Sequence, residues 1–358
     1  MQLDIERFVS GGTISVVEGM SRIDGNGYGI LYVVDEDKKL IGSLSDGDIR
    51  RWIVKTNDLT APIEKLMNRD PKYVYCEYSQ ENVELIKHKY PINSVPVLDR
   101  QNHIVDIILF DDLQNSRRYI AQKNQFDVPV VIMAGGKGTR LYPYTKILPK
   151  PLIPIRDTPI LERIIEGFHE FGIREFYITV NYRKNMIKSY FSELTQDYDL
   201  NFIEEDEPLG TGGSIKLIKK KFNTPIVVAN CDQIIQANYK DLYDFHMKSG
   251  NAITIVSALK KITIPYGVLK TKENGELICL DEKPTQSCFV NTGMYIINPE
   301  TIDLIPNGIV FHMTHLVDAV MKSGGKVGMY PVSEDSFLDM GEFDEMRRME
   351  EKLNIVSK

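Results

Sequence analysis

The chain of 358 residues contains little cysteine, a single tryptophan, no long apolar run and no excess of positive charge. Its four cysteines are scattered and form no CxxC pair, so neither a disulfide framework nor a zinc site is indicated and a reducing cytosol is favoured. The longest apolar runs fall far short of the roughly 18 to 20 residues that a membrane span needs, and the first residues lack the apolar segment of a signal peptide. We therefore expect a soluble cytoplasmic protein.

The balance of charge excludes further classes of protein. There are 43 Lys and Arg residues against 50 Asp and Glu residues, a formal net charge of −7. Binding to nucleic acid or to an anionic membrane calls for a basic surface, so neither is expected as a partner. An acidic chain can still hold a local cationic pocket for phosphates. The length predicts two or three domains, and the 42% of hydrophobic residues can fill their cores.

The first 118 residues contain an internal repeat. A strand, a polar turn and a second strand are predicted around Asp35, followed by a helix near Asp48. The same pattern returns around Asp99 and leads to Asp112, with the same spacing between the two acidic residues in each copy. This stretch resembles a tandem pair of CBS domains, a Bateman module, with copies at about residues 1–58 and 59–118.

The resemblance to CBS domains implies a nucleotide site. In that family a Ser or Thr three residues before an Asp holds an adenine nucleotide, and the first copy has this pair as Ser45 and Asp48. The second copy has Leu109 in place of the hydroxyl, so only the first is expected to bind. The alternative is that Ser45 and Asp48 cap the helix that begins there. The resemblance to CBS domains also implies a homodimer that forms through the CBS pair.

The pattern changes after a polar stretch, residues 119–127, which we interpret as a linker. From residue 128 to the end at 358, short β-branched apolar runs alternate with helical stretches. Such alternation predicts an α/β domain with a Rossmann-like, mostly parallel sheet and helices on both faces. Sheets of this kind bind their ligands at the carboxyl ends of the strands.

The strongest local feature is the segment VVIMAGGKGTRL at residues 130–141, a strand that runs into a glycine-rich loop. Glycines let backbone N–H groups approach an anion, and Arg140 supplies forked donors for phosphate oxygens. A Walker A loop is excluded because no Gly-Lys is followed by Ser or Thr. A Rossmann fingerprint is excluded because Leu141 stands where its third glycine belongs. Taken alone, such a loop is sometimes only a tight turn.

The continuation, AGGKGTRLYPYTKILPKPLIPI, resembles the signature of sugar-1-phosphate nucleotidylyltransferases. Prolines on both sides of Lys150 hold its charge in place. Further along, PLGTGG at residues 208–213 resembles the second glycine loop of that family, which lies against the nucleotide. The resemblance implies that the nucleotide is bound by Ala134, Gly135, Gly136, Gly138, Thr139, Gly210, Thr211 and Gly212.

Two acidic residues are candidate ligands for Mg²⁺. Asp232 follows an apolar strand, with Cys231 in place of the usual glycine of the family, and Asp339 lies in DMGE, with Glu342 in place of its threonine. Mg²⁺ is bound through one or two carboxylates plus substrate phosphates. Without the resemblance, an aspartate such as Asp232 is more often a helix cap. With it, the catalytic residues are expected to be Arg140, Lys150, Asp232 and Asp339, the last two holding the metal.

Three more segments resemble the sugar side of the same family: YGV at 266–268, EKP at 282–284 and NTG at 291–293. A Glu-Lys pair is by itself usually a solvated turn, but the order and spacing of the set are coherent. The resemblance implies that the sugar 1-phosphate is bound by Gly267, Glu282, Lys283 and Asn291.

Together these motifs predict transfer of a nucleotidyl group from a nucleoside triphosphate to a sugar 1-phosphate, with release of pyrophosphate. The PLGTGG loop is closer to the guanylyl- and mannose-type branch. A CBS pair ahead of such a domain is similar to the glucosamine-1-phosphate guanylyltransferases of legionaminic acid synthesis. The expected substrates are GTP and glucosamine 1-phosphate or a related amino sugar. The nucleotide sugar is expected to be used in the synthesis of surface or flagellar glycans. One alternative uses CTP or UTP with another sugar; another is a CBS nucleotide sensor with an inactive transferase-like domain.

Overall fold

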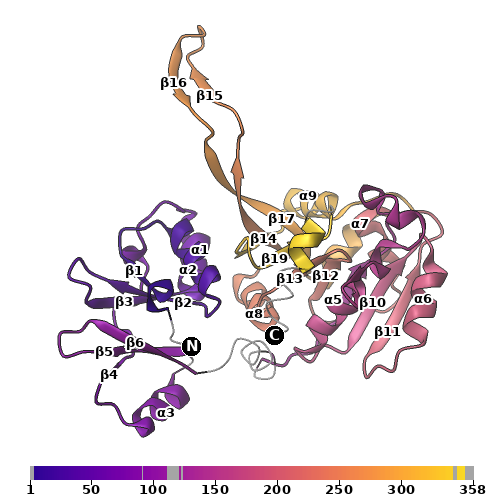
Figure 1. Cartoon of the computed structure of the whole chain (residues 1–358). Helices are drawn as coiled ribbons and strands as arrows, with labels where there is room; N and C mark the ends of the chain where they lie inside the picture. The colour runs from indigo at the N-terminus through magenta and orange to yellow at the C-terminus, as the bar shows by residue number, and fades with distance from the viewer. Residues whose placement is uncertain (1–3, 91, 111–120, 122–123, 342–344, 351–358) are drawn as a thin grey trace. The chain divides into compact units, whose positions relative to one another are not determined.

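The computed structural model describes residues 4–90, 92–110, 121, 124–341 and 345–350. Its contacts divide the chain into two compact units, one within Met1–Lys123 and one within Asn124–Leu353, and each is described by itself (Figure 1). Several predicted features lie outside the described residues: Asp112 of the second repeat, Glu342 of the DMGE segment, part of the linker and the last eight residues. In the part of the chain that is described, no helix has the length and apolar character needed to cross a membrane.

The N-terminal unit consists of two three-stranded sheets with the same topology. In each, the first strand runs parallel to the second, and the second runs antiparallel to the third, in the orders β1-β2-β3 and β4-β5-β6. The internal repeat in the sequence is therefore a repeat of structure. The elements are η1 (Ile5–Phe8), β1 (Val9–Gly11), α1 (Val16–Asn26), β2 (Ile30–Val34), β3 (Leu40–Ser45), α2 (Asp46–Thr56), η2 (Ile63–Lys65), β4 (Val74–Tyr75), α3 (Gln80–Lys89), β5 (Ser94–Leu98) and β6 (Ile104–Leu109).

The two repeats are joined through a shared core. The hydroxyl groups of Tyr32 and Ser94, one from each repeat, are 2.8 Å apart and buried. Phe8 and Tyr32 pack in one cluster with Ile107 of the second repeat. The second repeat has a small apolar cluster of its own, and because each sheet has only three strands, packing against the other repeat enlarges the buried core.

Ser45 and Asp48 begin helix α2 as a capping box. The Ser45 hydroxyl accepts from the backbone N–H of Asp48 at 3.2 Å, and the Asp48 carboxylate accepts from the backbone N–H of Ser45 at 2.9 Å. The hydroxyl also donates to Asp48 Oδ2 at 2.6 Å. These are the hydrogen bonds of the helix-cap alternative. Nucleotide binding by this pair stays a prediction.

The C-terminal unit is built on a seven-stranded sheet with the order β11-β10-β7-β12-β17-β14-β18. Strand β17 runs antiparallel to both of its neighbours, and the other neighbouring pairs are parallel, which confirms the predicted mostly parallel α/β sheet. The elements are β7 (Val130–Met133), η3 (Thr139–Leu141), η4 (Tyr144–Lys146), η5 (Lys150–Leu152), β8 (Pro154–Ile155), β9 (Thr158–Pro159), α5 (Ile160–His169), β10 (Glu175–Val180), α6 (Lys184–Ser192), β11 (Asp199–Glu204), α7 (Gly210–Gly213), η6 (Ser214–Leu217), β12 (Ile226–Asn230), β13 (Gln233–Ile235), α8 (Tyr239–Ser249), β14 (Ile253–Thr263), β15 (Val268–Thr271), β16 (Leu277–Asp281), β17 (Thr285–Ile297), η7 (Pro299–Leu304), α9 (Met313–Lys322), β18 (Val327–Val332) and β19 (Phe337–Asp339).

The core of this unit lies on both faces of the sheet. Every residue of β7 is buried, as expected for a parallel strand covered by helices on each side. Helix α5 buries five apolar residues at helical spacing, and α9 buries three. These packed layers hold the carboxyl ends of β7 and β12 in place.

A two-stranded ribbon projects from this unit. Strands β14 and β17 run on past the sheet, and the chain between them forms β15 and β16, which pair with each other. Figure 1 shows this ribbon standing away from the seven-stranded sheet. We call residues 264–284, the part beyond the ladder of β14 and β17, the arm.

Candidate active site

The candidate site lies where two neighbouring parallel strands end. Strand β7 ends at Met133 and runs into the first glycine loop, while β12, its direct partner, ends at Asn230, two residues before Asp232. Because parallel strands present their carboxyl ends at one edge of a sheet, the glycine loop and Asp232 come together there.

The two predicted metal ligands are brought together by a short antiparallel ladder. Strand β13 pairs with β19 so that Gln233 lies opposite Asp339, and the backbone N–H of Met340 donates to the carbonyl oxygen of Asp232 at 2.9 Å. Burial, followed by the nearby charge of Asp232, raises the pKa of Asp339 above its usual value. Two carboxylates held this close repel each other, so the site attracts cations.

Two cations face this carboxylate pair. Lys150 is buried, and its ammonium group forms an ion pair with Asp232 Oδ2, whose side chain is also almost fully buried. Arg140 is nearby, since its Nη1 lies 3.4 Å from the position that a Cβ on Gly341 would take, beside both carboxylate oxygens of Asp339. The structure thus assembles all four predicted catalytic residues, with Lys150 directed at Asp232.

The donor set suits a hard divalent cation. Among the described residues, no cluster of three or more His, Cys, Asp or Glu side chains could hold a metal. Mg²⁺ does not need one, because it keeps waters and substrate phosphates as its remaining ligands. Two carboxylates at an open sheet edge therefore fit Mg²⁺ and are too few for a structural zinc site.

The glycines of the first loop are needed for different reasons. A Cβ on Gly138, which has φ +64°, would lie 3.0 Å from Lys150 Cβ, and one on Gly135 would lie 2.7 Å from a Glu205 oxygen. A Cβ on Gly136 would meet nothing within 4 Å, and this residue is exposed. Packing therefore explains Gly135 and Gly138, whereas Gly136 leaves the backbone open to an anion from outside.

Glu205 is a buried acidic residue of the site that the motifs did not single out. It is 4% exposed, lies under Gly135, and accepts a hydrogen bond from the backbone N–H of Leu209 at 3.0 Å. Leu209 leads into the second glycine loop, so this one carboxylate supports both loops. The signal in the sequence was its position directly after strand β11, within a run of four acidic residues at 204–207.

The second glycine loop packs against the start of helix α9. The N–H groups of Gly212 and Gly213 both donate to Phe311 O, at 2.8 and 2.9 Å. Thr211 Oγ1 accepts from the N–H of Met313 at 3.1 Å, so its hydroxyl already has a structural partner. The loop is fixed by a segment about a hundred residues away in sequence, and His312, with its ring against Gly210, belongs to that segment.

Comparison with known proteins identifies the second unit. Residues 129–354, well over half of the chain, match the family model described as Nucleotidyl transferase. The chain belongs to the nucleotidyl transferase family. Residues 11–55 match the CBS domain. The resemblance to nucleotidyl transferases is thereby confirmed at the level of the family, and the resemblance to CBS domains is confirmed for the first repeat.

The curated relatives of this nucleotidyl transferase share part of its length. The mannose-1-phosphate guanyltransferase of Debaryomyces hansenii is 38% identical over 184 residues, and that of Saccharomyces cerevisiae 37% over 185 residues; each match covers 49% of this chain and 51% of the relative. A UTP--glucose-1-phosphate uridylyltransferase of Synechocystis is 32% identical over 197 residues, covering 50% of this chain and 51% of the relative. The chain spans about half the length of the curated relatives it matches.

A solved structure extends the likeness to the fold. HddC from Yersinia pseudotuberculosis, for which a complex with GMP-PN has also been solved, is 26% identical to this chain with a TM-score of 0.50. The match covers 99% of HddC and 63% of this chain. The latter is the share of this chain that the nucleotidyl transferase match at residues 129–354 occupies.

The predicted sugar-side residues of this nucleotidyl transferase fall into two places. The NTG segment is beside the carboxylates, because Gly293, with φ +78°, lies against Asn230 and Gln233 on either side of Asp232. Asn291 itself accepts from the N–H of Gly293 at 2.9 Å and donates to Tyr295 at 2.6 Å. The structure does not bring the other three to this edge, since they lie exposed on the arm: Gly267, Glu282 and Lys283.

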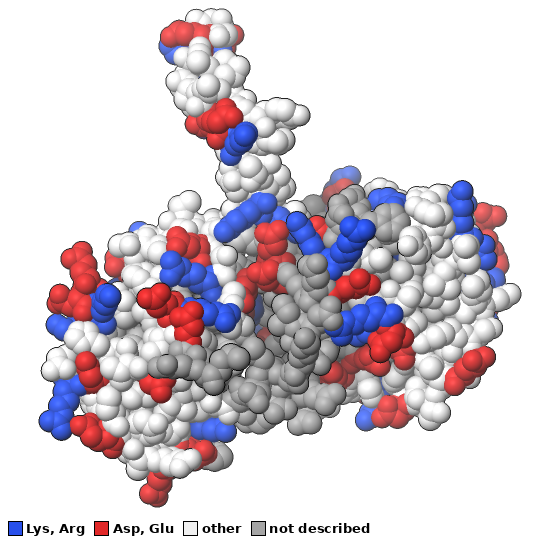
Figure 2. Space-filling view, viewed as in Figure 1, with Lys and Arg blue, Asp and Glu red and all other residues white. Residues whose placement is uncertain are grey.

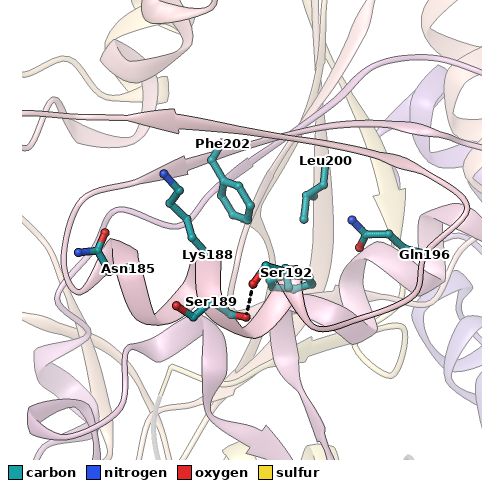
Figure 3. Close-up of a pocket in the computed structure, with 8 residues that line it drawn as sticks. Asn185, Lys188, Ser189, Ser192, Gln196, Leu200 and Phe202 are labelled. Atoms are coloured by element: carbon teal, nitrogen blue, oxygen red, sulfur yellow. Dashed lines mark hydrogen bonds between the residues drawn. The ribbon is translucent and has the colours of Figure 1, made fainter.

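Two surface features are separate from the site. A hollow of about 460 Å³ lies between α6 and β11 and is lined by Lys188, Leu200 and Phe202 among others (Figure 3). Its lining includes none of the candidate residues. On the face shown in Figure 2, basic and acidic side chains are interspersed. Among the described residues drawn on that face, there is no broad basic patch of the kind that binds nucleic acid.

Proposed function

We propose that this chain transfers a nucleotidyl group from a nucleoside triphosphate to a sugar 1-phosphate and releases pyrophosphate. The observation that carries the proposal is the convergence of Lys150, Arg140 and the two carboxylates beside a glycine loop whose backbone is open at Gly136. Membership of the nucleotidyl transferase family supports it.

The arrangement suits in-line displacement at the α-phosphorus. An oxygen of the sugar phosphate attacks, and pyrophosphate leaves on the opposite side, with no covalent intermediate on the protein. Cys231 is adjacent to Asp232, but burial raises the pKa of its thiol to about 12, so it remains protonated and is no nucleophile. The backbone around Gly136 and the forked donors of Arg140 would hold the triphosphate.

Asp232 and Asp339 would hold Mg²⁺, which when bound neutralises phosphate charge and polarises the α-phosphate. Lys150 also has an electrostatic role in this site. Its ammonium group pairs with the Asp232 carboxylate and offsets part of the negative charge that faces Asp339. The two prolines that flank Lys150 fix its backbone, so the charge is in place before substrates arrive.

GTP is the proposed nucleotide and glucosamine 1-phosphate, or a related amino sugar, the proposed acceptor, for a glycan route such as legionaminic acid synthesis. Several relatives are named mannose-1-phosphate guanyltransferases, and HddC was solved with GMP-PN, which supports a guanine nucleotide. The uridylyltransferase among the relatives supports the alternative of UTP. Mannose 1-phosphate is therefore the first competitor to test against the amino sugar.

The N-terminal unit is proposed to bind an adenine nucleotide through its first repeat. The CBS family match covers the first repeat, the one that contains Ser45 and Asp48. A melting-temperature shift with ATP or AMP that Ser45→Ala abolishes would support this role. Equal melting temperatures with and without nucleotide would leave Ser45 as a helix cap alone.

The enzyme proposal is tested by pyrophosphate release with Mg²⁺, across GTP, CTP, UTP and dTTP and a panel of sugar 1-phosphates. We expect the largest rate with GTP, and we expect Asp232→Asn to lose turnover by a factor of at least about 10² while the protein stays folded. The matched control is Asp303→Asn, on the surface with its side chain 89% exposed, which should keep full activity. If no combination of nucleotide and sugar 1-phosphate released pyrophosphate, the result would favour the alternative of a CBS sensor with an inactive second domain.

A further inference from the structure

The ammonium group of Lys150 lies on a carboxylate that the proposed metal needs. It forms an ion pair with Oδ2 of Asp232, and both residues are only 8% exposed. A divalent cation bound to Asp232 would lie close to this ammonium group, and two positive charges repel each other strongly in a buried site. Lys150 and a divalent cation therefore compete for Asp232.

The stem of Lys150 runs beside the first glycine loop. A Cβ on Gly138 would lie 3.0 Å from Lys150 Cβ and 3.3 Å from its Cδ. The prolines at 149 and 151 fix the backbone of this residue, whereas the four-carbon stem of a lysine is flexible. The backbone is thus held next to the loop proposed to bind the triphosphate, and only the end of the side chain is free to change its partner.

The charges of the site are balanced while Lys150 is on Asp232. With both carboxylates ionised, Asp232 and Asp339 carry two negative charges, and Lys150 and Arg140 carry two positive charges. A divalent cation added to this set would leave an excess of two positive charges. A triphosphate removes that excess, because it supplies an anion for an ammonium group that has left Asp232.

We propose that Lys150 is an exchangeable cation, which pairs with Asp232 before substrates bind and yields this carboxylate to the metal. Its ammonium group then pairs with a phosphate at the first glycine loop. The inference rests on the proposed function, which supplies the metal and the triphosphate. It makes the metal and the nucleotide strengthen each other's binding, since metal alone must break a buried ion pair that the nucleotide helps to replace.

The first test is the reactivity of Lys150 in the wild-type protein, measured by brief acetylation and mass spectrometry of the peptide that contains it. Saturating Mg²⁺ without nucleotide should raise the rate by about tenfold, because a pair intact in nine of ten molecules leaves about a tenth of them reactive. Mg²⁺ with GTP should lower the rate again. Lys188, paired with Glu204 on the surface, is the reference within the same protein and should not respond to Mg²⁺.

The second test is the affinity for Mg²⁺ without nucleotide, measured by calorimetry. Lys150→Met should tighten binding by at least about tenfold, because no ammonium group then has to leave Asp232. The control Arg140→Met removes a cation beside Asp339 instead and should have a smaller effect, since it lowers only the general repulsion. The acetylation test needs no variant, so it stands even where Lys150→Met folds poorly.

The outcomes separate this inference from the proposed function. Acetylation of Lys150 that Mg²⁺ leaves unchanged would overturn the exchange, and so would equal gains in Mg²⁺ affinity for Lys150→Met and Arg140→Met. Pyrophosphate release together with unchanged acetylation would overturn the exchange alone. Acetylation that depends on Mg²⁺, with no pyrophosphate release from any substrate pair, would support the exchange and overturn the proposed function.

Discussion

The buried pair of Lys150 and Asp232 makes a strong prediction about stability. Replacing Lys150 by methionine keeps the apolar stem and removes the ammonium group, which leaves Asp232 charged, buried and next to Asp339. Breaking a buried ion pair by removing one partner costs about 3 to 5 kcal/mol. At a urea slope of about 2 to 3 kcal/mol per molar, the unfolding midpoint at pH 7 should fall by more than about 1 M.

The pH dependence of this loss gives a sharper test. An acid whose pKa is raised in the folded state binds its proton more tightly there, so its contribution to stability is present at low pH and is lost as the pH rises through the folded pKa. The pKa of Asp339 is already raised, and Lys150 is one of the cations that oppose this rise, so without Lys150 the pKa of Asp339 should rise further. The deficit of Lys150→Met should therefore shrink as the pH falls.

Urea unfolding without metal, followed by circular dichroism at pH 7 and at pH 5, measures both effects. Trp52, the single tryptophan, lies in helix α2 of the N-terminal unit, so its fluorescence follows that unit separately. The control is Lys188→Met, which removes a cation from Glu204 on the surface, where such a pair is worth at most about 1 kcal/mol. An unchanged midpoint for Lys150→Met at pH 7, or a larger deficit at pH 5 than at pH 7, would refute the reasoning.

Three other outcomes follow from the site. Gly138→Ala should destabilise the protein by about 1 to 3 kcal/mol, because φ is positive at this position and the added carbon would meet the Lys150 side chain. Gly136→Ala should fold normally and weaken GTP binding in calorimetry. Equal stabilities of the two variants would contradict this difference between the glycines. Cys231 should resist iodoacetamide in the native protein while the two exposed cysteines react, and rapid labelling of Cys231 would mean that it is not buried. Because the pKa of Asp339 is raised, stabilisation by Mg²⁺ in thermal unfolding should disappear on acidification at a higher pH than for an ordinary aspartate; a constant shift down to pH 4 would remove Asp339 from the metal site.

The sequence was sufficient for features that depend on local chemistry. The alternation of strands and helices predicted the parallel sheet, and prolines around Lys150 predicted a fixed charge. The meeting of Asp232 with Asp339 was expected from the family likeness, and the ladder of β13 with β19 produces it. That ladder pairs two very short strands, which no pattern of hydrophobic residues reveals.

Other features depend on tertiary packing and could not be found in this way. Glu205 is one of four consecutive acidic residues, and only the path of the chain after β11 decides which one is buried. The motifs that contain Gly267 and Lys283 gave no sign that β14 and β17 run past the sheet and hold them on an arm. Sequence spacing does not specify the direction in which a ribbon leaves a sheet, because twist and strand length determine it.

Strands β14 and β17 join two parts of the C-terminal unit. They form one ladder from Thr263 and Thr285 at the foot of the arm to Ile253 and Ile297 at the far end of the sheet, with one irregularity between Ile255 and Ser257. Gly293 lies within that irregularity on β17, and its backbone is close to Asn230 and Gln233, which flank the candidate metal ligand Asp232. The foot of the arm and the residues that flank Asp232 are therefore connected through a single pair of strands, β14 and β17.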